Sequence, residues 1–286
     1  MTDKQQTITA LVLAGSRQPH DPVAAFRKKS LKAFADIGGH SMLKYVLHSL
    51  SECERIDRIL VCIPEDADFL DECPDVLDFM AEPHIERIAP KESPSASVCH
   101  VMETETSGDN LLVTTADHPL LSKDILDQFL DVFFREKEDV MVALTAVDMI
   151  EGLYPQVKRT RIKLEDDDYT GCNLFGLRGE NAIKAPQFWK DLDQYRKRPW
   201  RIAMKIGLWT LFLFLIKKLT LRQAMERLGK RVGVSICPVV ILDPHAGIDV
   251  DTLRDYDIVS HIIYKDTESF DIEAQAAEFF SPKDLL

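Results

Sequence analysis

The chain has 286 residues, of which 45% are hydrophobic and 29% charged, and this balance is enough to build a full globular core. Its formal net charge of −12 argues against a general nucleic-acid binder. The polar start MTDKQQTITA lacks the apolar core of a signal peptide, and the six cysteines are scattered without a C-x-x-C pair. We therefore expect a cytoplasmic protein with free, buried thiols rather than disulfides or a zinc site.

Short apolar runs alternate with helical patterns through the first half of the chain. Strands are predicted at residues 7–13, 58–63, 85–89, 110–116 and 140–147. Helices are predicted at 41–51 with Ser41 as N-cap, 66–80 with a break at Pro74, 95–105, and 122–137 opened by Ser122. This alternation is typical of βαβ units and predicts an α/β, Rossmann-like fold with a mostly parallel sheet covered on both faces. Ligands of such sheets bind at the carboxyl ends of the strands.

The pattern changes after Asp148. Residues 156–164 and 173–177 are predicted to be strands of a second, antiparallel part, joined by the acidic loop 165–168. Helices are predicted between 179 and 228, followed by a last strand at 232–242, an acidic turn GIDVDTLRDYDIV and a tail, 268–286, that forms a surface helix and a loose end. We divide the chain into a core (1–178 and 232–265), a helical basic and apolar insertion (179–231) and a C-terminal tail (266–286).

The first candidate site is the loop after the opening strand. The stretch LVLAGSRQPHDPVAAFRKKSLKAFADIGGHSML leaves an apolar strand at a single glycine, Gly15, and then becomes cationic. Backbone amides released after a strand can hold phosphate oxygens, and Arg and Lys side chains can neutralise a polyphosphate. A lone glycine is weak support, so a solvated basic loop is the alternative.

Three more segments carry polar side chains that are candidates for binding a metal or a nucleotide. Asp117 in TADHPLL follows a buried strand, where a carboxylate can hold Mg²⁺ or simply cap a turn. The segment GIDVDTLRDYDIV carries four aspartates that could converge on a metal, or it could be a helix capped by Asp251 or Thr252. The hydroxyls of PSASVCHVM, at a predicted helix start, could bond a ribose or a base edge, or serve as plain caps.

The order of these segments resembles a known family, the nucleoside-triphosphate transferases that include molybdenum-cofactor guanylyltransferases and sugar- and polyol-phosphate cytidylyltransferases. LVLAGS and KAFADIGGHSML match the opening motif and place the signature lysine at Lys32. PSASV matches the nucleotide-binding helix start, TADHPLL places a metal ligand at Asp117, and DVDTLRDYDIV places the second at Asp251. GCNLFGL resembles the segment that lines the acceptor pocket in this family. The resemblance covers residues 7–177 and 236–260.

What the resemblance implies is a nucleotidyltransferase of the glycosyltransferase-A-like type, which moves a nucleoside monophosphate from an NTP to a small phosphorylated acceptor and releases pyrophosphate. The implied residues are Lys32 and Arg17 for catalysis; Leu13, Ala14, Gly15, Ser16, Arg27, Ser95 and Ser97 for the nucleotide; Asp117 and Asp251 for Mg²⁺; and Asn173 and Arg198 for the acceptor. The opening loop departs from the family in having one glycine, so Arg17 and Arg27 compete for the arginine role.

We expect an Mg²⁺-dependent cytidylyltransferase that uses CTP and a polyol phosphate or phosphoglycerate, with lipid head-group synthesis as one destination. The alternatives are a guanylyltransferase of the molybdenum-cofactor type, a glycosyltransferase of similar fold, and a degenerate, non-catalytic transferase that acts at a membrane surface.

Residues 196–231 are unlike the rest of the chain. They hold eleven Lys or Arg and one Glu, a net charge of +10, around the apolar run 206–216. That run is too short to cross a bilayer, which takes about 20 residues. We favour a helix buried in the core or in a homodimer contact, with its basic flanks facing the acceptor or a membrane. The alternative is peripheral contact with an anionic membrane, which would place the protein at the membrane's inner face.

Overall fold

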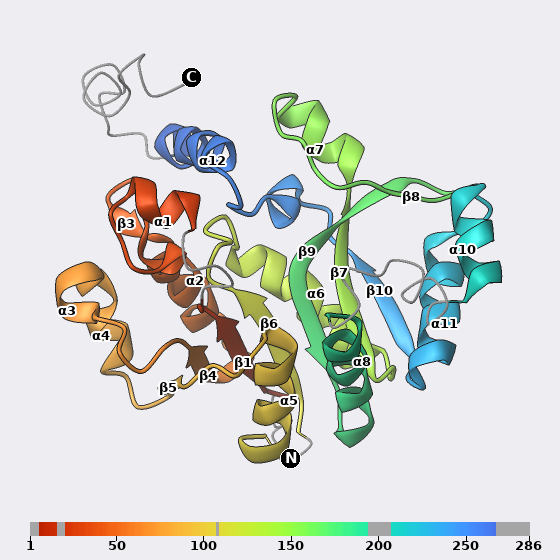
Figure 1. Ribbon diagram of the computed structural model, residues 1–286, viewed down its shortest axis with the longest axis horizontal. Helices are drawn as coiled ribbons and strands as arrows, with labels where there is room; N and C mark the ends of the chain where they lie inside the picture. The colour runs from red at the N-terminus through yellow and green to blue at the C-terminus, as the bar shows by residue number, and fades with distance from the viewer. Residues whose placement is uncertain (1–5, 16–20, 107–108, 194–206, 267–286) are drawn as a thin grey trace.

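A computed structural model of the chain describes residues 6–15, 21–106, 109–193 and 207–266. Its centre is one sheet of eight strands in the order β10-β7-β9-β6-β1-β4-β5, with β8 paired to β9 (Figure 1). The strands are β1 Ile8–Leu13, β4 Ile56–Cys62, β5 Ile85–Ile88, β6 Leu111–Thr115, β7 Val140–Ala146, β8 Ile162–Lys163, β9 Asp168–Leu177 and β10 Ile236–Val240. The pairs β1–β4, β1–β6, β4–β5 and β10–β7 are parallel. The predicted mostly parallel α/β sheet is therefore confirmed.

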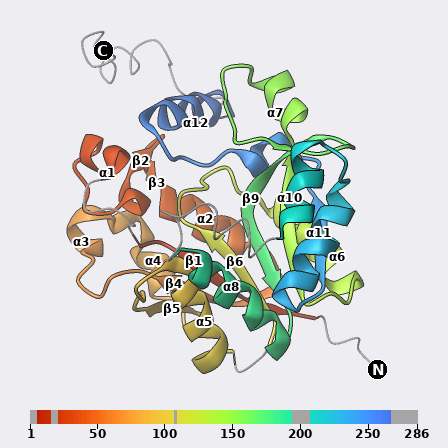
Figure 2. The same cartoon turned by 45° about the vertical axis from the view of Figure 1, so that its right-hand side comes forward.

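Helices cover both faces of the sheet, because successive residues of a strand point to opposite faces. In β1, Ala10 and Val12 join a core with helices α2 (Met42–Ser51) and α6 (Lys123–Arg135). Leu11 joins a second core with α5 (Pro94–Thr104) on the other face. Helix α8 (Lys184–Asp193) lies beside α5, as both views show (Figures 1 and 2), and α11 (Leu221–Val232) packs against β10.

Local capping signals set several helix starts as predicted. Ser41 accepts a hydrogen bond from the Lys44 amide, and Ser122 accepts one from Ile125. The predicted break at Pro74 is also present, because the 66–80 stretch divides into three short elements. These are α3 (Phe69–Glu72), a 3₁₀ turn η2 (Pro74–Val76) and α4 (Leu77–Met80). The remaining short elements are α1 (Pro22–Phe26), η1 (Lys32–Phe34), β2 (Asp36–Ile37), β3 (His40–Ser41), α7 (Val147–Leu153), η3 (Glu180–Ile183) and η4 (Pro244–Gly247).

The strand predicted at 173–177 is present and antiparallel, as expected, but it does not belong to a second part of the fold. β9 is ten residues long and runs antiparallel between β6 and β7, inside the main sheet. In this place it hydrogen-bonds to the edges of both neighbours, and its residues Cys172 and Leu174 enter the core. Of the predicted strand 156–164, only Ile162–Lys163 is extended and paired, as β8. Glycine at 176 lets α6 approach β9, since a Cβ there would lie 2.5 Å from the Phe133 ring.

The acidic segment GIDVDTLRDYDIV is largely helix rather than a turn. Helix α12 spans Leu253–Asp266. The Thr252 hydroxyl accepts from the Asp255 amide at 3.2 Å, and the Thr252 amide donates to the Asp255 carboxylate at 2.9 Å. Thr252, not Asp251, therefore caps this helix, and the side chain of Asp251 takes no part in the cap.

Within one copy of the chain, the apolar run in the insertion is only partly buried, and its burial in a homodimer contact stays a prediction. Helix α10 (Leu208–Leu215) packs inward through Leu213 and Phe214, but Trp209 and Leu215 are 64% and 70% exposed. Burial needs a facing element, and the described part of the chain provides one on the inner side of α10 alone. Within the described residues, no helix combines the length and the apolar character needed to cross a membrane.

All six cysteines are free, as predicted, and five of them are buried. The predicted tail at 268–286 lies outside the described residues, as does the basic stretch 196–206.

Candidate active site

Three residues that are distant in the chain meet at the carboxyl edge of the sheet. Asp117 follows the end of β6, Lys32 opens η1, and Asp251 precedes α12. The Lys32 Nζ lies 2.6 Å from Asp117 Oδ2 and 3.2 Å from Asp251 Oδ1, and it donates to the Val250 carbonyl at 2.9 Å. The Val250 amide donates to the Asp117 carbonyl, also at 2.9 Å. The two segments thus hold each other by their backbones, and the lysine is fixed between their carboxylates.

The electrostatics of this cluster keep the lysine charged. Burial alone would lower the pKa of Lys32, but Asp117 and then Asp251 outweigh that effect and raise the pKa above its ordinary value. Lys32 therefore carries a positive charge at neutral pH, held at a fixed point beside the open edge.

The donor set of the cluster fits a divalent cation. Asp117 Oδ1 is buried and has no hydrogen-bond partner among the described residues, while Asp117 Oδ2 contacts Lys32. A buried carboxylate oxygen without a partner is costly, and a cation would satisfy it. Within the described part of the chain, no three His, Cys, Asp or Glu side chains are grouped to hold an ion. Two carboxylates are still enough for Mg²⁺, which is usually held by one or two of them together with substrate phosphates.

A second network borders the first and includes Arg159, which the sequence analysis did not predict. Arg159 donates to the Asp249 carboxylate at 2.6 Å and to the Asp249 carbonyl at 2.7 Å, and the Asn173 amide donates to the same carboxylate at 2.6 Å. The side chain of Arg159 is only 9% exposed. Burial, together with the nearby Asp117 and Asp251, raises the pKa of Asp249 to about 6, although Arg159 opposes the shift.

Asn173 reaches this network through an unusual backbone conformation. Its φ of 49° lies in the left-handed region, which asparagine tolerates better than most residues. The register of β9 against β7 shifts at this point. The irregularity lets the Asn173 amide reach Asp249, which lies near Asp117 and Asp251. The resemblance to the family predicts that Asn173 binds the acceptor. Arg159 was missed because the sequence analysis treated 156–164 only as a strand, and no local pattern links Arg159 to Asp249, 90 residues away.

The predicted nucleotide loop is described only at its base. Leu13 ends β1, and the Ala14 amide donates to the Cys62 carbonyl at 2.9 Å. A Cβ built on Gly15 would lie 3.8 Å from the Pro90 Cβ, an ordinary contact. Packing therefore does not demand glycine at 15. Ser16 and Arg17, as well as the predicted acceptor residue Arg198, lie outside the described residues.

The other predicted nucleotide residues make contacts within the protein. Ser97 Oγ accepts from the Lys91 amide at 2.9 Å and donates to the Ser93 carbonyl at 3.2 Å, so it shapes the loop next to Gly15. Ser95 is buried in the first turn of α5. Arg27 lies 3.2 Å from Asp36, with its guanidinium 5.9 Å from the centre of the Tyr256 ring. These contacts join α1, β2 and α12, and none of them is to Lys32 or to its two carboxylates.

Comparison with known proteins shows the family of the chain. Residues 10–180 match the MobA-like NTP transferase domain, which is more than half of the chain. The chain belongs to the MobA-like NTP transferase family. No curated protein matches the sequence.

Solved structures share the fold of this NTP transferase at low sequence identity. A hypothetical transferase from Thermus thermophilus is 23% identical, with a TM-score of 0.72 over 88% of this chain and 100% of that one. The 4-diphosphocytidyl-2C-methyl-D-erythritol synthase of Anaerococcus prevotii gives 12% and 0.54 over 91% and 97%. A CMP:2-keto-3-deoxy-manno-octonic acid synthetase in complex with CTP gives 13% and 0.55 over 91% and 100%.

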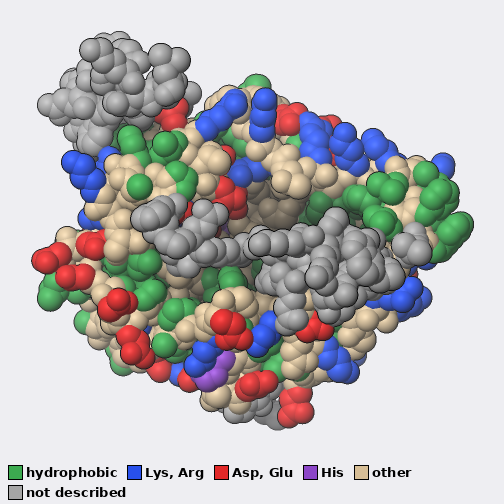
Figure 3. Space-filling view, viewed as in Figure 1, with side chains coloured by type: hydrophobic (Ala, Val, Ile, Leu, Met, Phe, Trp, Pro, Cys, Tyr) green, Lys and Arg blue, Asp and Glu red, His purple; other side chains and the backbone are tan. Residues whose placement is uncertain are grey.

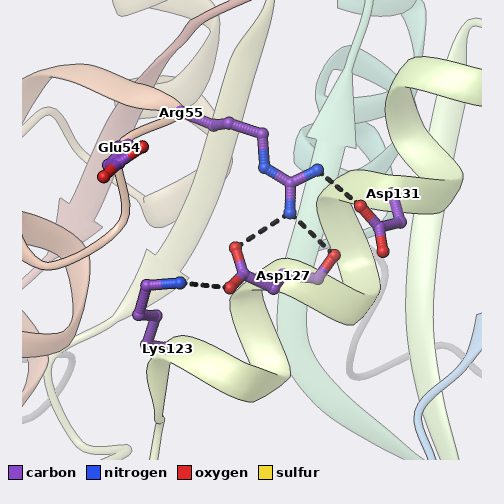
Figure 4. A pocket seen from close by; sticks show the side chains of 5 residues that line it. All are labelled: Glu54, Arg55, Lys123, Asp127 and Asp131. Atoms are coloured by element: carbon purple, nitrogen blue, oxygen red, sulfur yellow. Dashed lines mark hydrogen bonds and ion pairs between the residues drawn. The ribbon is translucent and has the colours of Figure 1, made fainter.

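An open surface pocket of about 300 Å³ elsewhere on the NTP transferase is a poor candidate site. Its lining residues are Glu54, Arg55, Lys123, Asp127 and Asp131 (Figure 4). Arg55 lies just before β4, at the amino end of the parallel strands and away from Asp117. Arg55 bonds Asp127 and Asp131, and Lys123 bonds Asp127, so these charges neutralise one another.

We expect Arg159→Met to destabilise the NTP transferase by about 3 kcal/mol, because it leaves Asp249 buried without its cation. Urea unfolding would measure the change. Arg161→Met is the matched control, because Arg161 also pairs with carboxylates but is 31% exposed. The double variant Arg159→Met with Asp249→Asn should regain part of the loss. Equal losses in Arg159→Met and Arg161→Met would show that the buried pair does not stabilise this edge.

Proposed function

We propose that this NTP transferase moves a nucleoside monophosphate from an NTP, with CTP favoured, to a small phosphorylated acceptor such as a polyol phosphate or a phosphoglycerate. The observation that carries the proposal is the meeting of Lys32 with Asp117 and Asp251 at the carboxyl edge of the sheet. Family membership supports nucleotidyl transfer, and solved neighbours of the same fold include cytidylyl-type synthases, one of them in complex with CTP. GTP is the alternative donor, because the family resemblance extends to molybdenum-cofactor guanylyltransferases.

The chemistry asked of the chain is positioning and charge stabilisation. An acceptor phosphate oxygen attacks the α-phosphorus in line, the bond to the bridging oxygen breaks, and pyrophosphate leaves. Lys32 is held by the Val250 carbonyl and two carboxylates, so its ammonium is preorganised to stabilise charge that develops on the phosphates. Asp117 and Asp251 would hold Mg²⁺, which supplies further neutralisation of the phosphate charge when bound. No covalent intermediate on the protein is required.

Two further features agree with the proposal. The presence of Lys32, Asp117 and Asp251 in one cluster argues against a degenerate, non-catalytic transferase. The six free cysteines favour a reducing compartment such as the cytoplasm.

We expect CTP with Mg²⁺ to raise the melting temperature of the protein, and to raise it far less when EDTA is present. A ligand at 100 times its dissociation constant that binds only the folded state adds about 2.7 kcal/mol of stability. Differential scanning fluorimetry with each of the four NTPs would measure this and would rank the donors. A larger shift with GTP would replace CTP by GTP as the donor, and no shift with any NTP would contradict the proposed function.

A further inference from the structure

Helix α10 presents apolar side chains on its outer face as well as on its inner one. Outward, Trp209, Phe212, Leu215 and Ile216 are 64%, 48%, 70% and 47% exposed. Their spacing of three and four residues places them on one side of the helix. The rings of Trp209 and Phe212 stack, with centroids 5.4 Å apart, and so form a flat aromatic surface. A surface helix normally has a polar outer face, and an apolar one marks a contact with something else.

The inner face of α10 shows that this exposure is not a sign of a loose helix. Leu213 and Phe214 pack against a cluster that contains Tyr169, Leu219 and Leu221. The outer side chains are thus held in place on the sheet domain.

Positive charge borders this apolar face at the C-terminal end of α10. Lys217 and Lys218 follow α10 directly and are exposed, and the φ of 53° at Lys217 turns the chain there. Residues 207–231 contain six Lys or Arg and a single Glu, which pairs with Arg222 at 3.4 Å. The nearby acids belong to the loop 165–168, where the Glu165 amide donates to the Leu219 carbonyl at 2.9 Å and Asp166 accepts from the Leu221 amide at the start of α11. Figure 3 shows the hydrophobic patch at the α10 end of the molecule, with Lys and Arg side chains along its borders.

We propose that α10 docks the protein peripherally on an anionic membrane. Trp209, Phe212, Leu215 and Ile216 would enter the boundary between head groups and acyl chains, where Trp is favoured, and Lys217 and Lys218 would contact anionic head groups. The eight residues of α10 cannot span a bilayer but suffice to lie in its interface. Such a contact would hold the transferase next to lipid. The proposal does not depend on which nucleotide the protein uses.

Charge decides between a membrane and a second copy of the chain. In a two-fold symmetric contact through α10, the lysine pair of each copy would lie close to the same patch of the other, and like charges would repel. An anionic bilayer is instead complementary to this patch. Because the whole chain has a net charge of −12, the rest of the molecule is repelled by the same surface, which orients α10 toward it.

The test is flotation of the full chain with vesicles of phosphatidylcholine, with and without phosphatidylglycerol. We expect binding to the anionic vesicles that weakens as salt is added, and little binding to the neutral ones. Lys217→Gln with Lys218→Gln should reduce the partition coefficient by roughly fivefold for each lysine. Lys28→Gln with Lys137→Gln is the matched control, because both lysines are exposed and lie outside residues 207–231.

The apolar side of the contact has its own matched pair. Trp209→Ser with Phe212→Ser should weaken binding by about tenfold or more, since both side chains would enter the lipid. Leu70→Ser with Leu242→Ser, both 73% exposed elsewhere, should leave binding unchanged. All four sites are exposed, so none of these variants is expected to prevent folding.

Equal binding to neutral vesicles, or equal losses in the control pairs, would overturn the proposal. The proposal would also be overturned if the protein did not float with vesicles and sedimentation showed a dimer that the double variant Trp209→Ser with Phe212→Ser dissociates. Nucleotidyl transfer assayed without vesicles should be the same in all these variants, so a failure here leaves the proposed function standing.

Discussion

Lys32→Ala is expected to lower turnover by about a hundredfold or more, which corresponds to about 2.7 kcal/mol of lost transition-state stabilisation. The ammonium of Lys32 is fixed by three oxygens at 2.6, 2.9 and 3.2 Å, so little reorganisation is needed when charge develops on the phosphates. Because this contact strengthens as the reaction proceeds, kcat should fall more than the affinity for the NTP. Steady-state kinetics with CTP and the acceptor would separate the two.

The matched control for Lys32 is Lys28→Ala. Lys28 belongs to the same cationic stretch but is exposed. Lys28→Ala should keep near-normal kcat. A melting temperature for Lys32→Ala is needed as well, because the substitution leaves Asp117 without its cation. Near-normal kcat in Lys32→Ala would rule out the role that we assign to this lysine, whereas an equal fall in Lys28→Ala would point to the charge of the loop as a whole.

Asp117→Asn is expected to abolish Mg²⁺-dependent turnover, a loss of about a thousandfold or more, in keeping with the several kcal/mol that a bound metal supplies. Asp117 brings to the site a buried oxygen that has no hydrogen-bond partner in the described part of the chain, and the amide of asparagine is a weaker ligand for a hard cation. Asp251→Asn should have a smaller effect, because its side chain is 64% exposed and would hold Mg²⁺ only together with Asp117. Turnover at increasing Mg²⁺ concentrations would show whether each variant loses metal affinity.

Asp257→Asn is the control for both aspartates. It lies in the same acidic segment, but its side chain is on α12 and contacts His261 at 3.6 Å. It should have the turnover and the Mg²⁺ requirement of the natural chain. If Asp117→Asn retained a normal Mg²⁺ dependence, the two-carboxylate site would be wrong; if Asp257→Asn also lost it, the metal would be held elsewhere in this segment.

The first half of the fold could be predicted from the sequence, because its signals are local. Ser41, Ser122 and Pro74 act on the residues beside them, so the starts of α2 and α6 and the break before α4 follow from chain chemistry alone. The meeting of Asp117 with the base of the cationic loop also followed, because parallel strands bring their carboxyl ends to one edge. The order of the motifs then indicated Lys32 and Asp251, although each is a single residue in a stretch with no periodicity.

Only the tertiary structure decided the rest, because strand pairing and burial depend on residues far away in the chain. The apolar pattern of β9 fits a separate sheet as well as it fits the place between β6 and β7, and hydrogen bonding to both neighbours determines which is formed. Arg159 and Asp249 are 90 residues apart, and no local pattern announces a pair that forms across that distance. Helix α10 shows that a local pattern can also predict burial that the tertiary structure does not provide. Its apolar sequence predicts burial, but burial requires a facing surface, and the described chain supplies one to Leu213 and Phe214 while Trp209 and Leu215 remain exposed.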